Sequence, residues 1–91
     1  MNILEKARLD SELESLAGWA HLNEAIEKTW AFADFKEALA FIVKVGILAE
    51  LANHHPEIKN VYNRVVLRLN THEVGAITDK DIDLARQINT I

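Results

Sequence analysis

The sequence predicts an α+β fold, a two-layer α/β sandwich in which helices cover an antiparallel four-stranded sheet in the order α-β-β-α-β-β-α. Three observations lead to this prediction. A long segment of good helix formers occupies residues 34–54. Stretches with apolar residues at alternate positions lie on both sides of it, at residues 19–32 and 60–71. Shorter segments with helix-capping residues lie near the two ends of the chain.

The first element is expected to be a short helix within LDSELESLAGW, residues 9–19. Asp10 and Ser11 are candidate caps at its start, and Gly18 is suited to its end. One face of this helix would carry the leucines Leu9, Leu13 and Leu16.

The stretch WAHLNEAIEKTWAF, residues 19–32, shifts toward the period of two that is typical of strands. Asn23 and Glu24 suit a turn, so two antiparallel strands are expected on either side of them. Lys28 interrupts the alternation, because it shares the parity of the apolar residues Ile26, Trp30 and Phe32.

A central helix is expected to begin at Asp34, with Glu37 three residues later as in a capping box. Its apolar residues are spread wider than the roughly 100° stripe that packing on one side requires. Two explanations are open: the helix lies between the sheet and neighbouring helices, or it forms a subunit interface. The residues outside the expected stripe are Ala40, Val43, Ile47 and Leu51.

After Pro56, the run NVYNRVVLRLNT at residues 60–71 predicts two strands, or one strand with a bend at Asn63. HEVGAI, residues 72–77, is expected to be a loop. Thr78 then begins the last helix, with acidic residues in its first turn, where they suit the helix dipole; these are Asp79 and Asp81.

Composition limits the possible functions. The 91 residues suit a single domain over 1–91, and the absence of cysteine excludes disulfides and thiolate metal sites. The net charge of −4, without a Lys/Arg block, argues against direct nucleic-acid binding. No apolar segment reaches the roughly 20 residues that cross a bilayer, and residues 1–10 do not read as a secretion signal. We therefore expect a soluble, cytoplasmic protein without membrane contact.

The adjacent histidines at the end of the central helix are the first candidates for chemistry. Pro56 disfavours helical geometry at His55, so the helix should end near His54 and the two rings should point in different directions. The helix C-terminus favours a protonated imidazole, and Glu50, four residues before His54, can orient that ring. The alternative is that both histidines are exposed cations that complement the helix dipole.

His72 is a third candidate, because Asp79 and Asp81 follow it at a helix start, where a carboxylate can accept a ring N–H. The alternative is a solvated loop histidine. A three-ligand zinc site from Glu50, His54 and His72 is conceivable but disfavoured, because no second paired ligand motif is present. No phosphate-binding glycine loop or serine nucleophile motif occurs either.

Together these motifs resemble a known family. ExxxHHPE at residues 50–57, NVYN at 60–63, THE at 71–73 and DKDIDLA from Asp79 are similar to the pterin-4a-carbinolamine dehydratases. The resemblance covers nearly the whole chain, and its specificity lies in the combined spacing, since HHP alone is not specific. It implies a sheet covered by helices on one face, and dimers or tetramers, which favours the subunit-interface explanation of the central helix.

The resemblance also implies an activity, the dehydration of 4a-hydroxytetrahydropterin to quinonoid dihydropterin, which recycles the pterin of aromatic amino-acid hydroxylases. It implies no metal and no cofactor. It places three histidines in the pterin pocket, His54, His55 and His72. It gives them two supporting carboxylates, Glu50 and Asp81. It implies further substrate contacts at Pro56, Glu57, Thr71 and Glu73.

The chemistry needs an acid for the leaving hydroxyl and a base for N5, and histidine can be either. We hypothesise that His54 and His72 exchange these protons while His55 positions the ring. Ile58 departs from the tryptophan of animal members, which leaves the aromatic contact with the pterin in doubt. Two non-enzymatic alternatives are a pterin-binding module and an interaction protein, because animal members also act as dimerisation cofactors of a homeodomain transcription factor. The sequence does not specify which pterin is used.

Overall fold

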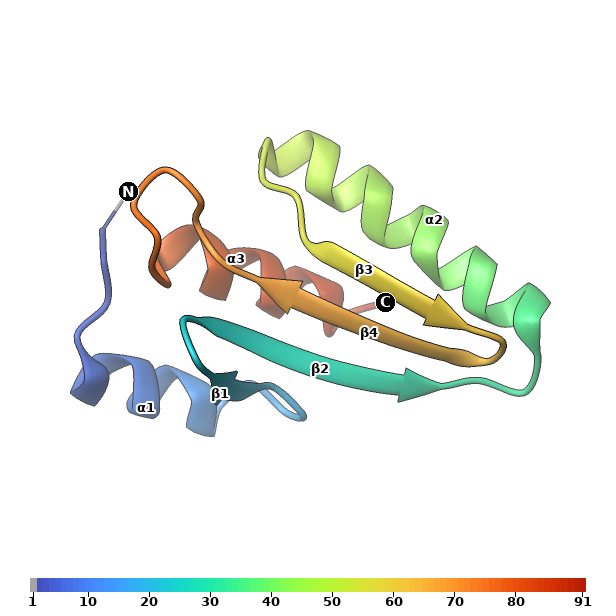
Figure 1. Ribbon diagram of the computed structural model, residues 1–91, viewed down its shortest axis with the longest axis horizontal. Helices are drawn as coiled ribbons and strands as arrows, with labels where there is room; N and C mark the ends of the chain where they lie inside the picture. The colour runs from blue at the N-terminus through green and yellow to red at the C-terminus, as the bar shows by residue number, and fades with distance from the viewer. Residues whose placement is uncertain (1) are drawn as a thin grey trace.

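The computed structural model describes residues 2–91. Three helices and four strands follow in the predicted order α-β-β-α-β-β-α (Figure 1). The elements are α1 (Lys6–Glu14), β1 (Ala20–Leu22), β2 (Ala25–Ala31), α2 (Phe35–Ala52), β3 (Glu57–Val61), β4 (Arg64–Leu69) and α3 (Asp79–Ile88). The predicted α+β class and element order are confirmed.

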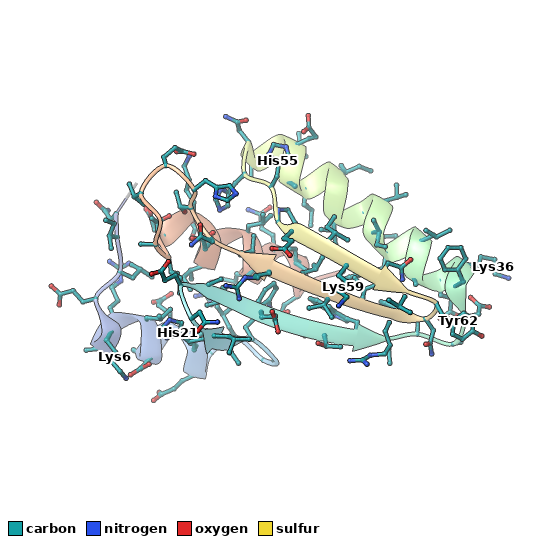
Figure 2. The ribbon with its side chains drawn as sticks, in the orientation of Figure 1. Lys6, His21, Lys36, His55, Lys59 and Tyr62 are labelled. Atoms are coloured by element: carbon teal, nitrogen blue, oxygen red, sulfur yellow. The ribbon has the colours of Figure 1, made fainter. Side chains whose placement is uncertain are left out.

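The strands form one antiparallel sheet in the order β1-β2-β4-β3. Asn23 adopts a left-handed conformation (φ 57°) in the β1–β2 turn, which confirms the turn predicted there. Tyr62 does the same (φ 51°) between β3 and β4, so the run at residues 60–71 is a hairpin rather than one bent strand. His55 and Tyr62 lie near opposite ends of β3 (Figure 2).

The core lies between one face of this sheet and the helices. Along β4, Val65, Leu67 and Leu69 are fully buried, whereas the residues between them are exposed or half-buried. The helices contribute buried residues to the same cluster, including Phe41 from α2 and Ile82 from α3. The opposite face of the sheet carries the two arginines of β4 and one valine between them, so it is the more polar of the two faces.

The central helix starts as predicted. The Asp34 side chain accepts a hydrogen bond from the Glu37 N–H (2.8 Å), and Glu37 Oε1 accepts one from the Ala33 N–H (3.3 Å). The helix ends at Ala52, two residues before the predicted end.

The outward face of α2 is exposed. Five apolar residues at intervals of four form this face, which we call the α2 stripe: Phe35, Leu39, Val43, Ile47 and Leu51. Their exposed fractions run from 43% for Leu39 to 81% for Leu51. On its inner side α2 packs against β4 and α3, as the first explanation expected. Within residues 2–91 no helix covers the stripe, so this packing does not account for the full width of the apolar surface.

The start of α1 also differs from the prediction. The helix begins at Lys6, and its N-cap, Glu5, makes no side-chain capping bond. Asp10 and Ser11, the predicted caps, therefore lie within the helix, where Asp10 pairs with Lys6 at 2.9 Å. A tertiary contact accounts for the earlier start, because the Leu4 N–H donates to the Ile77 carbonyl (3.0 Å) and fixes the chain before the helix.

Gly18 lies beyond α1, in the turn toward β1, and its φ of 85° explains the choice of glycine there. The partial burial of Lys28 has a local explanation as well. Its ammonium group donates to the Ala17 carbonyl and to Asn89 Oδ1, each at 2.9 Å, and lies over the Trp30 ring. Desolvation by burial lowers the pKa of Lys28. None of the helices in residues 2–91 has the length and apolar character needed to cross a membrane.

Candidate active site

The end of α2 directs the two adjacent histidines to different places. Asn53 adopts a left-handed conformation (φ 50°), and the His54 N–H donates back to the Ala49 carbonyl (3.1 Å), which closes the helix. This turn sends the His54 side chain into the protein, where only 8% of it is exposed, and leaves the His55 side chain 56% exposed. The prediction that the rings point in different directions is confirmed.

His54 pairs with Asp81 in the first turn of α3. The distance between His54 Nε2 and Asp81 Oδ1 is 2.5 Å, and the ring nitrogen is the donor because the carboxylate can only accept. Asp81 Oδ2 accepts two further bonds, from the Thr71 hydroxyl (2.8 Å) and from the Thr78 N–H (2.9 Å). Every one of these groups is buried, so the carboxylate is both desolvated and fully hydrogen-bonded.

His55 pairs with Glu50 instead, at 2.5 Å between His55 Nε2 and Glu50 Oε1. The prediction that Glu50 orients His54 is therefore wrong. The i, i+4 rule holds only while the chain stays helical, and the left-handed residue Asn53 interrupts it. Beyond Asn53 it is His55, five residues after Glu50, that lies against this carboxylate.

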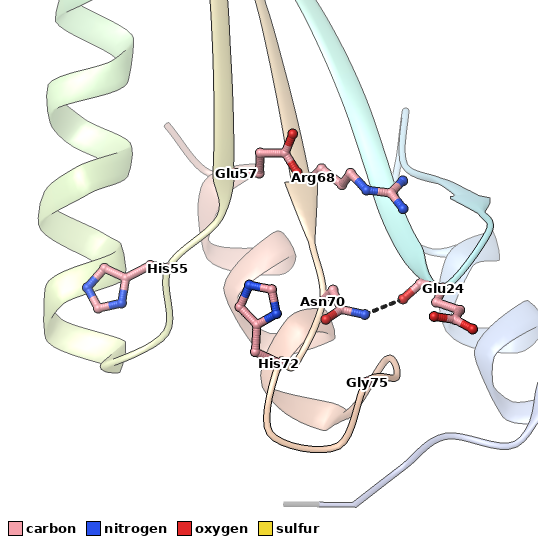
Figure 3. A pocket seen from close by; sticks show the side chains of 7 residues that line it. All are labelled: Glu24, His55, Glu57, Arg68, Asn70, His72 and Gly75. Carbon is pink, nitrogen blue, oxygen red and sulfur yellow. Dashed lines mark hydrogen bonds between the residues drawn. The ribbon is translucent and has the colours of Figure 1, made fainter.

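A pocket of about 320 Å³ opens next to His55 (Figure 3). It is lined by Glu24, His55, Glu57, Arg68, Asn70, His72 and Gly75. The alternation of β4 continues past its end: Arg68 within the strand, and Asn70 and His72 beyond it, alternate with the buried Leu69 and Thr71. The pocket therefore belongs to the polar side of the sheet, and the His54–Asp81 pair to the core side.

His72 lies in this pocket and not beside either predicted carboxylate. Asp81 is bound to His54, as described above, and Asp79 Oδ1 accepts a hydrogen bond from the Asn2 N–H (2.9 Å). That bond lowers the pKa of Asp79. The prediction that Asp79 or Asp81 fixes the His72 tautomer is wrong, because His72 projects from the opposite side of the chain to Thr71, which faces Asp81.

The remaining predicted contacts separate into two groups. Glu57 lines the pocket, whereas the half-buried Pro56 before it does not. Thr71 is fully buried against Asp81, and Glu73 is exposed in the following loop; neither lines the pocket. Thr71 therefore supports the site from the core side.

Sequence reasoning missed three polar residues on the far wall of the pocket. Asn70 donates from Nδ2 to the Glu24 carbonyl (2.6 Å), which joins β4 to the β1–β2 turn (Figure 3). Arg68 donates from Nη1 to the Leu22 carbonyl (3.1 Å) in the same region. The alternation of Arg68 and Asn70 with His72 could have identified two of these residues; Glu24, in a turn distant in sequence, carries no such signal.

The zinc site considered from Glu50, His54 and His72 does not form. Glu50 faces His55, and His54 faces Asp81. Among residues 2–91, histidine and acidic side chains do not gather into a group of three or more that could hold a metal ion.

Two imidazoles and carboxylates in a small polar pocket can bind a polar heterocycle and transfer protons to and from it. Fold and pocket together define a small α+β protein with acid–base groups at the end of its sheet. The protein family follows from comparison with known proteins. The family model for pterin 4 alpha carbinolamine dehydratase matches residues 2–91.

Similar proteins that carry the family's name occur in several bacteria. One from Opitutus terrae is 47% identical over 98% of this chain and 93% of its own length. One from Rhizobium etli is 50% identical over 91% of this chain and 84% of its own. This chain belongs to the pterin-4a-carbinolamine dehydratase family, as its motifs predicted.

One solved structure agrees with this assignment, and a second shares the fold. The crystal structure of a transcriptional coactivator/pterin dehydratase from Brucella melitensis has a TM-score of 0.93 and 37% identity, over 98% of this chain and 97% of that one. A pterin dehydratase-like protein described as a RuBisCO assembly factor of the alpha-carboxysome has a TM-score of 0.64 at 18% identity, over 79% of this chain and 83% of that one. The second likeness shows a shared fold only.

Proposed function

We propose that this protein dehydrates 4a-hydroxytetrahydropterin to quinonoid dihydropterin by histidine acid–base catalysis. Membership of the family supports the reaction. The observation that carries the mechanism is that His55 and His72 line one small pocket from two different segments of the chain. Such a pair can hold a proton donor and a proton acceptor on either side of one ring.

The reaction is a balanced elimination of water. The C4a–O bond breaks as an acid protonates the hydroxyl, and the N5 electron pair forms the C4a=N5 bond. A base removes the N5 proton, so one proton enters the leaving water and one leaves the ring. An imidazolium and a neutral imidazole can supply the two roles, and they exchange forms in each turnover.

His55 and His72 are the better candidates for these roles, because both line the pocket. This changes the sequence-based hypothesis, which gave proton exchange to His54 and positioning to His55. His54 is buried and bonded to Asp81, so we assign it the task of holding the end of α2 against the start of α3. In this role His54 and Asp81 fix where His55 and His72 lie.

The direct test is a stopped-flow assay with chemically generated 4a-hydroxytetrahydropterin, with and without the protein. Acceleration that is lost in both His55→Ala and His72→Ala supports the proposal. Binding of pterin without acceleration would instead support a non-catalytic pterin-binding module. In the cell, we expect a cytoplasmic enzyme that recycles the pterin of an aromatic amino-acid hydroxylase.

We propose further that copies of the chain associate through the α2 stripe into dimers or tetramers. An apolar face that stays exposed on a small protein usually marks an interaction site. The same face favours a second candidate function, interaction with another protein, which the coactivator name of the Brucella relative also suggests. Sedimentation of the wild type and of Val43→Glu tests the self-association of the chain through the α2 stripe. A fully monomeric wild type would contradict it.

A further inference from the structure

We propose that the Glu57 carboxylate binds the 2-amino-4-oxopyrimidine edge of the substrate and makes the pocket specific for pterins over their 2-oxo counterparts. This inference rests on the proposed function, because it assumes that the pocket holds a pterin ring. It adds a specificity determinant to the two histidines that exchange protons.

The position of Glu57 suits this role. It begins β3 two residues after His55, and both residues line the pocket with His72. Figure 3 shows the two side chains on different sides of this segment: the His55 ring turns toward α2, where it bonds Glu50, and the Glu57 carboxylate turns toward β4. The carboxylate therefore enters the pocket from β3, on the side where the His72 ring lies.

The arginine opposite Glu57 is occupied elsewhere. Arg68 is its cross-strand partner on β4, but the guanidinium donates to the Leu22 carbonyl (3.1 Å) and lies 3.8 Å from Glu27 Oε1. Figure 3 shows the guanidinium directed toward the β1–β2 turn and the Glu57 carboxylate at the top of the pocket. None of the ion pairs within residues 2–91 includes Glu57. Its oxygens are available to a ligand.

The substrate offers a matching edge. In a pterin, the reacting C4a is followed around the ring by the C4 carbonyl, the N3–H and the 2-amino group. The last two are adjacent donors, and one carboxylate can accept from both through its two oxygens. A 2-oxo ring such as lumazine places an acceptor where the amino group stood. A site built to accept from N–H groups rejects an analogue that lacks one.

Calorimetric titration of pterin and of lumazine at one fixed pH tests the inference, using the wild type, Glu57→Gln and Glu27→Gln. The wild type should prefer pterin by about 10- to 100-fold, as expected for a charge-assisted pair of hydrogen bonds. The Glu57→Gln amide can donate to the 2-oxo group, so the preference should fall to about one or reverse. Glu27 flanks Arg68 on the other side and does not line the pocket, so Glu27→Gln should keep the wild-type preference.

Two results would overturn the inference. One is a wild-type preference near one; the other is an equal loss of preference in both variants, which would indicate a general charge effect. Glu57→Asp, which keeps the carboxylate, should retain part of the preference and guards against a folding defect in Glu57→Gln. Failure of the proposed function is recognised separately: the wild type would then bind pterin selectively without accelerating dehydration. Normal dehydration without selectivity would refute only the role of Glu57.

Discussion

Two histidine–carboxylate pairs form at the end of α2, from adjacent histidines, and their surroundings are opposite. His54 and Asp81 are buried on the core side of the sheet, with side chains 8% and 0% exposed. His55 and Glu50 lie on the surface, with side chains 56% and 78% exposed. Both pairs have the same N–O distance of 2.5 Å, so geometry alone does not distinguish them.

The difference lies in what each pair would lose if broken. A buried carboxylate without its partners keeps its desolvation penalty, so breaking a buried pair is strongly destabilising. An exposed pair exchanges its partner for water at little cost. We therefore propose that His54–Asp81 holds the site together, whereas His55 acts on the ligand. The predictions that follow test this division, from the largest expected effect to the smallest.

The largest effect is expected on catalysis. His55→Ala and His72→Ala should each slow dehydration by about 10²- to 10⁴-fold, the usual loss when an acid or base is removed. Both variants should keep wild-type stability, because the two side chains are exposed. Stopped-flow turnover and chemical unfolding measure the two properties. Near-normal turnover in both variants would contradict their assignment, and would return His54 to consideration.

In contrast to the two histidine variants, Asp81→Ala should mainly lower the stability of the protein. It removes the partner of His54 and of Thr71 together with the cap on the Thr78 N–H, so we expect a loss of about 3–5 kcal/mol in the free energy of unfolding. Denaturant unfolding at a fixed protein concentration measures this loss. Asp83→Ala, an exposed change on the same helix, is the control and should stay within about 0.5 kcal/mol of the wild type. A mild loss for Asp81→Ala would show that the buried pair does not hold the site together.

Glu50→Gln should have little effect on stability, about 0.5 kcal/mol or less, because the pair is exposed. Since Glu50 orients His55, we expect turnover to fall several-fold, far less than in His55→Ala. The ratio of turnover in the two variants measures how much His55 depends on its partner. An equal loss of turnover in Glu50→Gln and His55→Ala would show that the reaction needs Glu50 as much as it needs His55.

The smallest effect concerns Asp79, which lies two residues before the buried Asp81 but is only half-buried. The Asn2 N–H lowers its pKa below the ordinary 3.8, so the charged form favours the folded state. This contribution is present above about pH 4 and is lost as the pH falls through the lower, folded-state pKa. The wild type should therefore be slightly more stable than Asp79→Asn at pH 7, and the difference should vanish in acid. A difference that grows toward low pH would contradict this sign.

Most of the fold could be predicted because its signals are local. The Asp34 and Thr78 caps, the turn at Asn23 and the alternation along β4 each involve residues close in sequence. The start of α1 could not be predicted in this way, because it depends on the bond between Leu4 and Ile77.

The sequence predicted which residues line the pocket better than it predicted which carboxylate bonds which histidine. The resemblance to the family predicted His55, Glu57 and His72 as site residues, and all three line the pocket. The assignment of carboxylates to histidines failed, because a single left-handed residue, Asn53, reverses which ring faces Glu50. Left-handed conformations of asparagine depend on the tertiary context as well as on sequence.

The hydrogen bonds that Asp81 makes at the start of α3 have a consequence for motion. Asp81 joins Thr78 at the helix start to Thr71 in the loop and to His54, 27 residues earlier in the chain. Because these groups share one carboxylate, we expect them to open to solvent together, as one cooperative unit. The backbone amides of Thr78 and His54 should therefore exchange hydrogen at the same rate. That rate would report how often the hydrogen bonds around Asp81 open in the native protein.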